Sequence, residues 1–128
     1  MRWECLRIRS VRWVGLVLLG GSLAGATGSA GKQRVERLER EARALANPKG
    51  CEKVEECALV GLGLKSCGGP RTHVAYCSRT TDGAALKARL EALEEAERAW
   101  QREESQASNC GLTRVPRLRW EGGECRAR

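Results

Sequence analysis

The chain has 128 residues and a formal net charge of +7 at pH 7, with 23 lysines and arginines against 16 acidic residues. This length excludes several large domains and suits one small domain. Because the chain has no phenylalanine, one tyrosine and four tryptophans, its apolar core alone gives little stability, and its cysteines become important.

The first 30 residues have the pattern of a secretory signal peptide. Four arginines precede the apolar run VGLVLLGGSLAGA at 14–26, and small residues follow it. The run is shorter than the roughly 20 apolar residues that span a membrane, and no cysteine for lipid attachment stands at 23–31. We expect residues 1–30 to be a signal peptide, cleaved after Ala26 or Ala30, that contacts the membrane only before cleavage. The mature protein is then secreted or periplasmic.

Cleavage would change both the charge and the cysteine count. It removes Cys5, four arginines and one glutamate, so the net charge falls from +7 to +4. Six cysteines remain: Cys51, Cys57, Cys67, Cys77, Cys110 and Cys125. An even number of cysteines in a short exported chain predicts a disulfide framework, so we expect reduction to unfold the protein.

Residues 32–46 form the first predicted helix, because apolar residues recur in them at helical spacing. These residues are Val35, Leu38, Ala42 and Leu45. Pro48 and Gly50 then end the helical pattern. We interpret 31–50 as an N-terminal helix and linker, which either packs on the following domain or remains apart from it.

A hairpin is predicted next. The apolar segment CALVGLGL (57–64) and the segment THVAYCS (72–78) have the composition of strands. Between them lies SCGGP (66–70), whose glycines and proline favour a tight turn. The two strands should therefore pair in antiparallel fashion.

A long amphipathic helix is predicted over 83–105, with Asp82 or Thr81 as its N-cap and Trp100 at the end of a leucine stripe. Its acidic residues are expected to form a solvated face: Glu91, Glu94, Glu95, Glu97, Glu103 and Glu104. Short strands are expected at 118–120 and 124–127.

This order of elements predicts an α+β domain over residues 51–128, preceded by the extra helix. A small antiparallel sheet would be packed by the long amphipathic helix and stapled by disulfides. Six cysteines allow fifteen pairings. We favour bridges between two strands of the sheet and between the hairpin turn and the loop after the helix. The favoured pairs are Cys57–Cys125, Cys67–Cys110 and Cys51–Cys77.

The stretch GLGLKSCGGPRTHVAYC (61–77) contains the single histidine and suggests several kinds of active site. A phosphate-binding loop needs glycine directly before Lys65, where Leu64 stands. The chain has no Cys-x-x-Cys motif for redox chemistry, and its cysteine spacings lack the close pairs of structural zinc sites. A thiol nucleophile beside His73 would compete with disulfide formation. We therefore expect no catalytic residue, no metal site and no cofactor here, and interpret the stretch as a turn tied by disulfides.

Basic and aromatic residues suggest a binding surface. The tail from 114 to 128 has five arginines against two glutamates, with Trp120 among them, and this composition suits anionic partners. We expect most of these arginines to face the acidic side of the long helix, and we expect no nucleic acid to bind. The candidate binding surface comprises Arg71, His73, Tyr76, Arg117, Arg119 and Trp120.

The spacing of these motifs resembles that of small, exported, cysteine-rich bacterial proteins. Their pattern is C-x5-C, an apolar strand, a CGGP turn, an aromatic strand, a helix, and a closing segment with C…P and G-x-C. The matching positions are Cys51, Cys57, Cys67, Gly68, Gly69, Pro70, Tyr76, Cys110, Pro116 and Cys125. The chain departs from this group at Cys77, where serine is common. The resemblance covers residues 51–128 and implies a fold but no enzymatic activity.

These observations favour a non-enzymatic binding protein. Its cross-linked loops suit an inhibitor-like role, because a preorganised loop loses little entropy on binding. The partner would be a protein or an anionic ligand of the cell envelope. The alternative is a structural protein of the cell envelope, or a small hydrolase that uses the region around His73.

Overall fold

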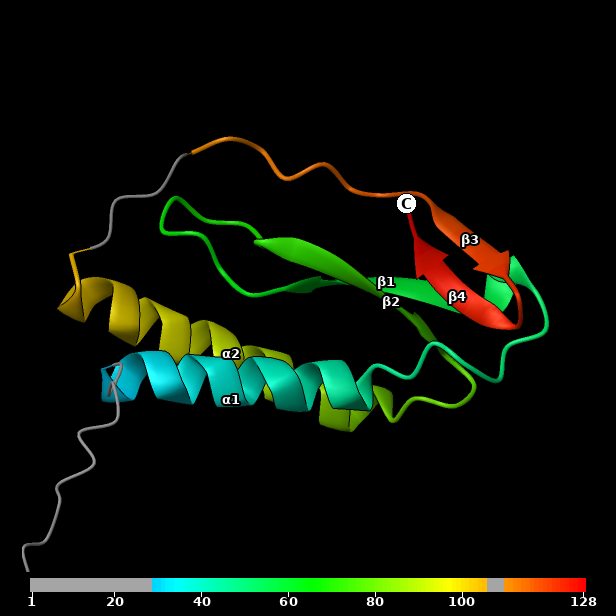
Figure 1. Ribbon diagram of the computed structural model, residues 1–128, viewed down its shortest axis with the longest axis horizontal. Coiled ribbons are helices and arrows are strands. Elements are labelled where there is room, and N and C mark those ends of the chain that lie inside the picture. Colours follow the sequence, from blue (N-terminus) through cyan, green and yellow to red (C-terminus); the bar gives the residue numbers. More distant parts are fainter. Residues whose placement is uncertain (1–28, 106–109) are drawn as a thin grey trace, which may run out of the picture.

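The computed structural model describes residues 29–105 and 110–128 and shows an α+β fold, as the sequence predicts (Figure 1). The elements are α1 (Ala30–Leu45), the short helix η1 (Val54–Glu56), β1 (Cys57–Leu62), β2 (Thr72–Cys77), α2 (Gly83–Glu103), β3 (Leu118–Glu121) and β4 (Glu124–Ala127). The predicted signal peptide lies almost entirely outside the described residues. Within them, no helix is long and apolar enough to cross a bilayer.

The two helices lie side by side and antiparallel (Figure 1). The Ser29 hydroxyl accepts a hydrogen bond from the Lys32 amide at the start of α1. Asp82 caps α2 in the same way, as predicted, through a 3.0 Å bond from the Ala85 amide. Such caps satisfy amides that have no partner within the helix.

The largest apolar cluster lies between these helices. Its buried residues are Val35, Leu38, Ala42, Ala46, Leu62, Leu86, Leu90, Leu93 and Ala96. Helix α1 therefore shares one core with α2 and β1. The predicted stripe of α2 is confirmed at its three leucines, and Trp100 packs partly buried at the edge of the cluster.

The strands form two antiparallel hairpins rather than one continuous sheet. In the first, Cys57 of β1 lies opposite Cys77 of β2. In the second, Trp120 of β3 lies opposite Cys125 of β4. A single bridge between Lys49 and Glu124 links the second hairpin to the segment that follows α1.

Three disulfides join these parts, with the pairing favoured from the sequence. They are Cys51–Cys77, Cys57–Cys125 and Cys67–Cys110, with Cα–Cα distances of 5.5, 5.5 and 5.6 Å. The first two are buried together in a second small cluster with Ala75. The third is exposed and joins the β1–β2 turn to the segment before β3.

Candidate functional site

The chain between β1 and β2, residues 63–71, forms a supporting turn that is fixed to α2 by a buried carboxylate. Glu97 on α2 has only 2% of its surface exposed. One of its oxygens accepts a hydrogen bond from the Leu64 amide, and the other accepts a 2.6 Å bond from Arg71 Nε. Gln101, one helical turn further, donates to the Leu64 carbonyl at 2.7 Å. The expectation that Glu97 belongs to a solvated face is therefore wrong.

Arg71 also ties the supporting turn to the other helix. Its guanidinium contacts Glu39 of α1 at 2.7 Å as well as Glu97 at 2.6 Å. Gly63 makes this approach feasible, because its φ is +74° and an added Cβ would lie 2.6 Å from Arg71 Nε. A side chain at position 63 would therefore displace the guanidinium.

The two carboxylates around Arg71 differ in their pKa. Burial raises the pKa of Glu97 above its usual 4.5, against the opposing effect of Arg71. For Glu39, burial acts in the same direction, but hydrogen bonds from Arg71 and Arg43 outweigh it and the pKa is lowered. Both Glu97 oxygens accept hydrogen bonds from protein donors, so the cluster anchors the supporting turn to α2.

Residues 110–117 form an exposed segment, here called the tethered loop, that lies against the supporting turn (Figure 1). The Cys67–Cys110 bridge holds its first residue. Lys65 Nζ donates to the Gly111 carbonyl, and the Thr113 hydroxyl donates to the Pro70 carbonyl at 2.8 Å. The loop contains no turn or bend between these anchors and β3.

The far end of the tethered loop is held by the second hairpin. Arg117 and Arg128 exchange two backbone hydrogen bonds, of 2.6 and 3.0 Å. Pro116 fixes its own φ and restricts Val115 before it to extended conformations. The loop is therefore constrained at both ends and along its length.

The outward side chains of the tethered loop are unusually exposed for apolar residues. Leu112 is 98% exposed and Val115 is 71% exposed. Arg114 between them is also exposed, and its side chain makes no hydrogen bond or ion pair with any described residue. The sequence predicted a loop here and included Arg117 in the candidate binding surface, but it did not single out Leu112, Arg114 or Val115, although Cys110 and the Val115-Pro116 pair were signals of constraint.

The structure distributes the predicted binding residues over separate places. Arg71 is engaged in the ion pairs described above, and Tyr76 packs partly buried against the helix core. His73 lies on β2 with its Nδ1 atom buried and without a hydrogen-bond partner. His73 also lines a shallow cavity with Glu124 and Arg126 of β4, so it lies beside the second hairpin, whereas Arg71 and Tyr76 contact the helices.

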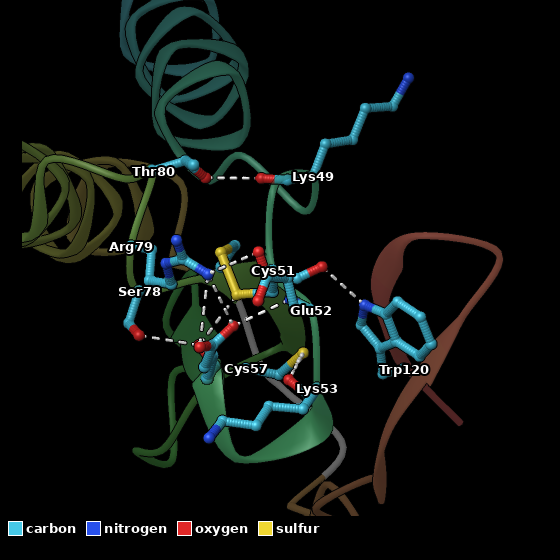
Figure 2. Close-up of polar contacts among 11 residues, drawn as sticks. Lys49, Cys51, Glu52, Lys53, Cys57, Ser78, Arg79, Thr80 and Trp120 are labelled. Atoms are coloured by element: carbon cyan, nitrogen blue, oxygen red, sulfur yellow. Dashed lines mark hydrogen bonds and ion pairs between the residues drawn. A yellow bond between two sulfur atoms is a disulfide. The ribbon is translucent and has the colours of Figure 1, made fainter.

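In the second hairpin, Trp120 lies beside the loop that precedes β1. Its indole nitrogen donates to the Cys51 carbonyl at 2.8 Å, and the side chain is 40% exposed (Figure 2). Arg117 and Arg119 are exposed nearby in the chain. The expectation that the tail arginines face α2 is not met by Arg126 and Arg128. These two pair with Glu124 and Glu121 of the same hairpin, at 3.4 and 3.2 Å.

The cysteines offer no thiolate in this structure. All six cysteines of residues 29–105 and 110–128 form disulfides. The sulfur atoms of Cys51, Cys57 and Cys125 lie within 4.8 Å of one another, but a disulfide sulfur is neither a nucleophile nor a metal ligand of thiolate type. A thiol nucleophile beside His73 therefore has no residue to supply it among these six.

Comparison of the chain with models of protein families, with curated proteins and with solved structures finds no match. The tethered loop is the feature of the described chain that most clearly presents side chains outward from a rigid support.

Proposed function

We propose that the protein is an exported, disulfide-stabilised binding protein without enzymatic activity, and that it presents the tethered loop to a protein partner in an inhibitor-like manner. The observation that carries this proposal is the loop itself. Two apolar side chains, Leu112 and Val115, project from a segment that is anchored at both ends.

Anchoring supports a binding role because it reduces the entropy that a loop loses when a partner orders it. The anchors of the tethered loop are a disulfide, a side-chain hydrogen bond from Thr113 and the paired backbone of Arg117. Apolar residues at the tip favour a protein partner, since burial of Leu112 and Val115 would contribute to affinity. An anionic envelope ligand would instead bind through the basic residues of the loop, Arg114 and Arg117, and would leave Leu112 and Val115 without a role.

Export is supported by the three bridges, because disulfides persist in oxidising compartments. The mass of the exported protein, measured with and without reduction, tests this part of the proposal. We expect cleavage near Ala26 or Ala30 and a gain of six hydrogens on reduction. A free thiol in the exported protein would contradict the three-bridge arrangement.

Site-specific photo-crosslinking tests the binding role. A photoreactive amino acid at Leu112 should give one covalent protein adduct in cells that export the protein. The same probe at Lys87, which is exposed on α2, serves as the control and should give none. The adduct should persist when His73 is replaced by alanine. Failure to form an adduct at position 112, or equal adducts at both positions, would refute the proposal.

A further inference from the structure

The backbone of the tethered loop is available to a partner. Within the described residues, positions 112–116 make no backbone hydrogen bond, and the chain there is extended. An extended segment with free amides and carbonyls is the form in which a polypeptide pairs with a strand of a binding cleft. The loop can therefore be bound along its main chain as well as through its side chains.

Exposure and chemistry together select one side chain of the loop for a deep pocket. Thr113 points inward, because its hydroxyl donates to the Pro70 carbonyl. Leu112, Arg114 and Val115 are exposed. Arg114 is the long cationic member of these three, with no partner among the described residues. Its neighbour Val115 is held in extended conformations by Pro116.

From this arrangement we infer that the partner is a serine protease with trypsin-like specificity, and that Arg114 occupies its primary specificity pocket. This inference rests on the proposed binding function. A pocket of this class has a carboxylate at its base that pairs with arginine or lysine. The protease serine would then attack the peptide bond between Arg114 and Val115.

The anchors explain why such a segment inhibits the protease. In acyl transfer, the protease serine oxygen bonds to the Arg114 carbonyl carbon while its proton passes to the catalytic histidine. The bond from that carbon to the Val115 nitrogen breaks, and the nitrogen takes the proton. In a flexible substrate the new amine then diffuses away, and water completes hydrolysis.

Here the new amine is retained beside the acyl carbon. The Cys67–Cys110 bridge holds the chain before the broken bond, and the Arg117–Arg128 hydrogen bonds hold the chain after it. A reacting group held in place has a very high effective concentration. Attack by the Val115 amine therefore re-forms the peptide bond and releases the serine, in competition with water.

Inhibition of purified proteases by the oxidised, exported protein tests the inference. We expect inhibition of trypsin, with chymotrypsin and elastase much less affected. Replacing Arg114 with alanine should weaken trypsin inhibition about 100-fold or more, as for an anchoring hot-spot residue. Arg114→Lys should retain most of it. Arg40→Ala is the matched control, because this exposed arginine lies on α1 outside the loop, and it should inhibit like the unaltered protein.

Three results would overturn the inference. The first is the absence of trypsin inhibition, or rapid cleavage of the chain as an ordinary substrate. The second is an equal loss of inhibition in the Arg114→Ala and Arg40→Ala proteins. The third is an adduct formed at position 112 with a protein other than a protease, which would leave the proposed binding function intact. The absence of any adduct at position 112 would refute both.

Discussion

Replacing Cys67 and Cys110 with serine removes the bridge that fixes the tethered loop to the supporting turn. Both residues are exposed, so serine leaves no cavity and buries no hydroxyl. The change in stability then reports mainly how strongly the bridge restricts the unfolded chain.

The expected loss can be estimated from the positions of the cysteines. They are separated by 43 residues in sequence, and closing such a loop stabilises a protein by about 4 kcal/mol in the chain-entropy treatment. However, the Cys57–Cys125 bridge already connects Cys67 to Cys110 by a second path through the chain. This path runs from 67 to 57, across the bridge, and from 125 to 110, and comprises about 25 residues. Because both routes restrict the unfolded chain together, the expected loss falls to about 3 kcal/mol.

Chemical denaturation of the oxidised proteins measures this loss directly. Helix content at low denaturant should be unchanged, because the core between α1 and α2 contains neither cysteine. The comparison variant replaces Cys57 and Cys125, which are 9% and 3% exposed. It should lose more stability, since the new hydroxyls are buried. A loss below about 1 kcal/mol for the exposed pair would contradict the chain-entropy reasoning.

Three further predictions concern single residues. Burial raises the pKa of Glu97 above 4.5, so the folded protein binds the Glu97 proton more tightly than the unfolded chain does. The stabilisation from this proton is therefore complete below pH 4.5 and is lost as pH rises through the raised pKa. The unfolding free energy relative to Glu97→Gln should therefore fall as pH rises, and a difference that increases with pH would contradict this. In the protein cleaved after Ala26, which retains Ser29, Ser29→Ala removes the cap of α1 and should cost about 1 kcal/mol in denaturant unfolding, whereas Ser29→Asp should not. Gly63→Ala should destabilise more than Gly69→Ala in the same assay. Both positions have positive φ, but only the Cβ at 63 meets another group; equal losses would show that the contact is unimportant.

The elements that the sequence predicts well are those with local signals. The stripe of leucines and the Asp82 cap specify α2, and the glycines at 68 and 69, with φ of 95° and 77°, specify the turn. The three bridges match the pairing favoured from the sequence, but strand placement does not select it, because Cys57 and Cys77 lie opposite each other and each bonds to another cysteine. The sequence did not predict that the strands form two separate sheets. Whether β2 and β4 pair with each other depends on tertiary contacts, which the strand pattern does not contain.

The candidate site was harder to predict because its partners are distant in sequence. Glu97 follows Leu93 by four positions and so continues the buried stripe. This spacing was a signal, but its charge favoured a solvated position. The groups that make its burial tolerable are Arg71 and the Leu64 amide, 26 and 33 residues away. No local pattern connects them, so only the folded turn reveals the anchor.

The supporting turn holds the tethered loop through one covalent contact and through hydrogen bonds. The disulfide reaches the loop from Cys67, and the Thr113 hydrogen bond reaches it from Pro70. The turn itself is fixed to both helices through Arg71. The position of the loop therefore depends on the helix core, although no loop residue belongs to that core. A small core can thus support a rigid binding loop. The Arg71 ion pairs fix the supporting turn to the helices, and the Cys67–Cys110 bridge fixes the loop to that turn.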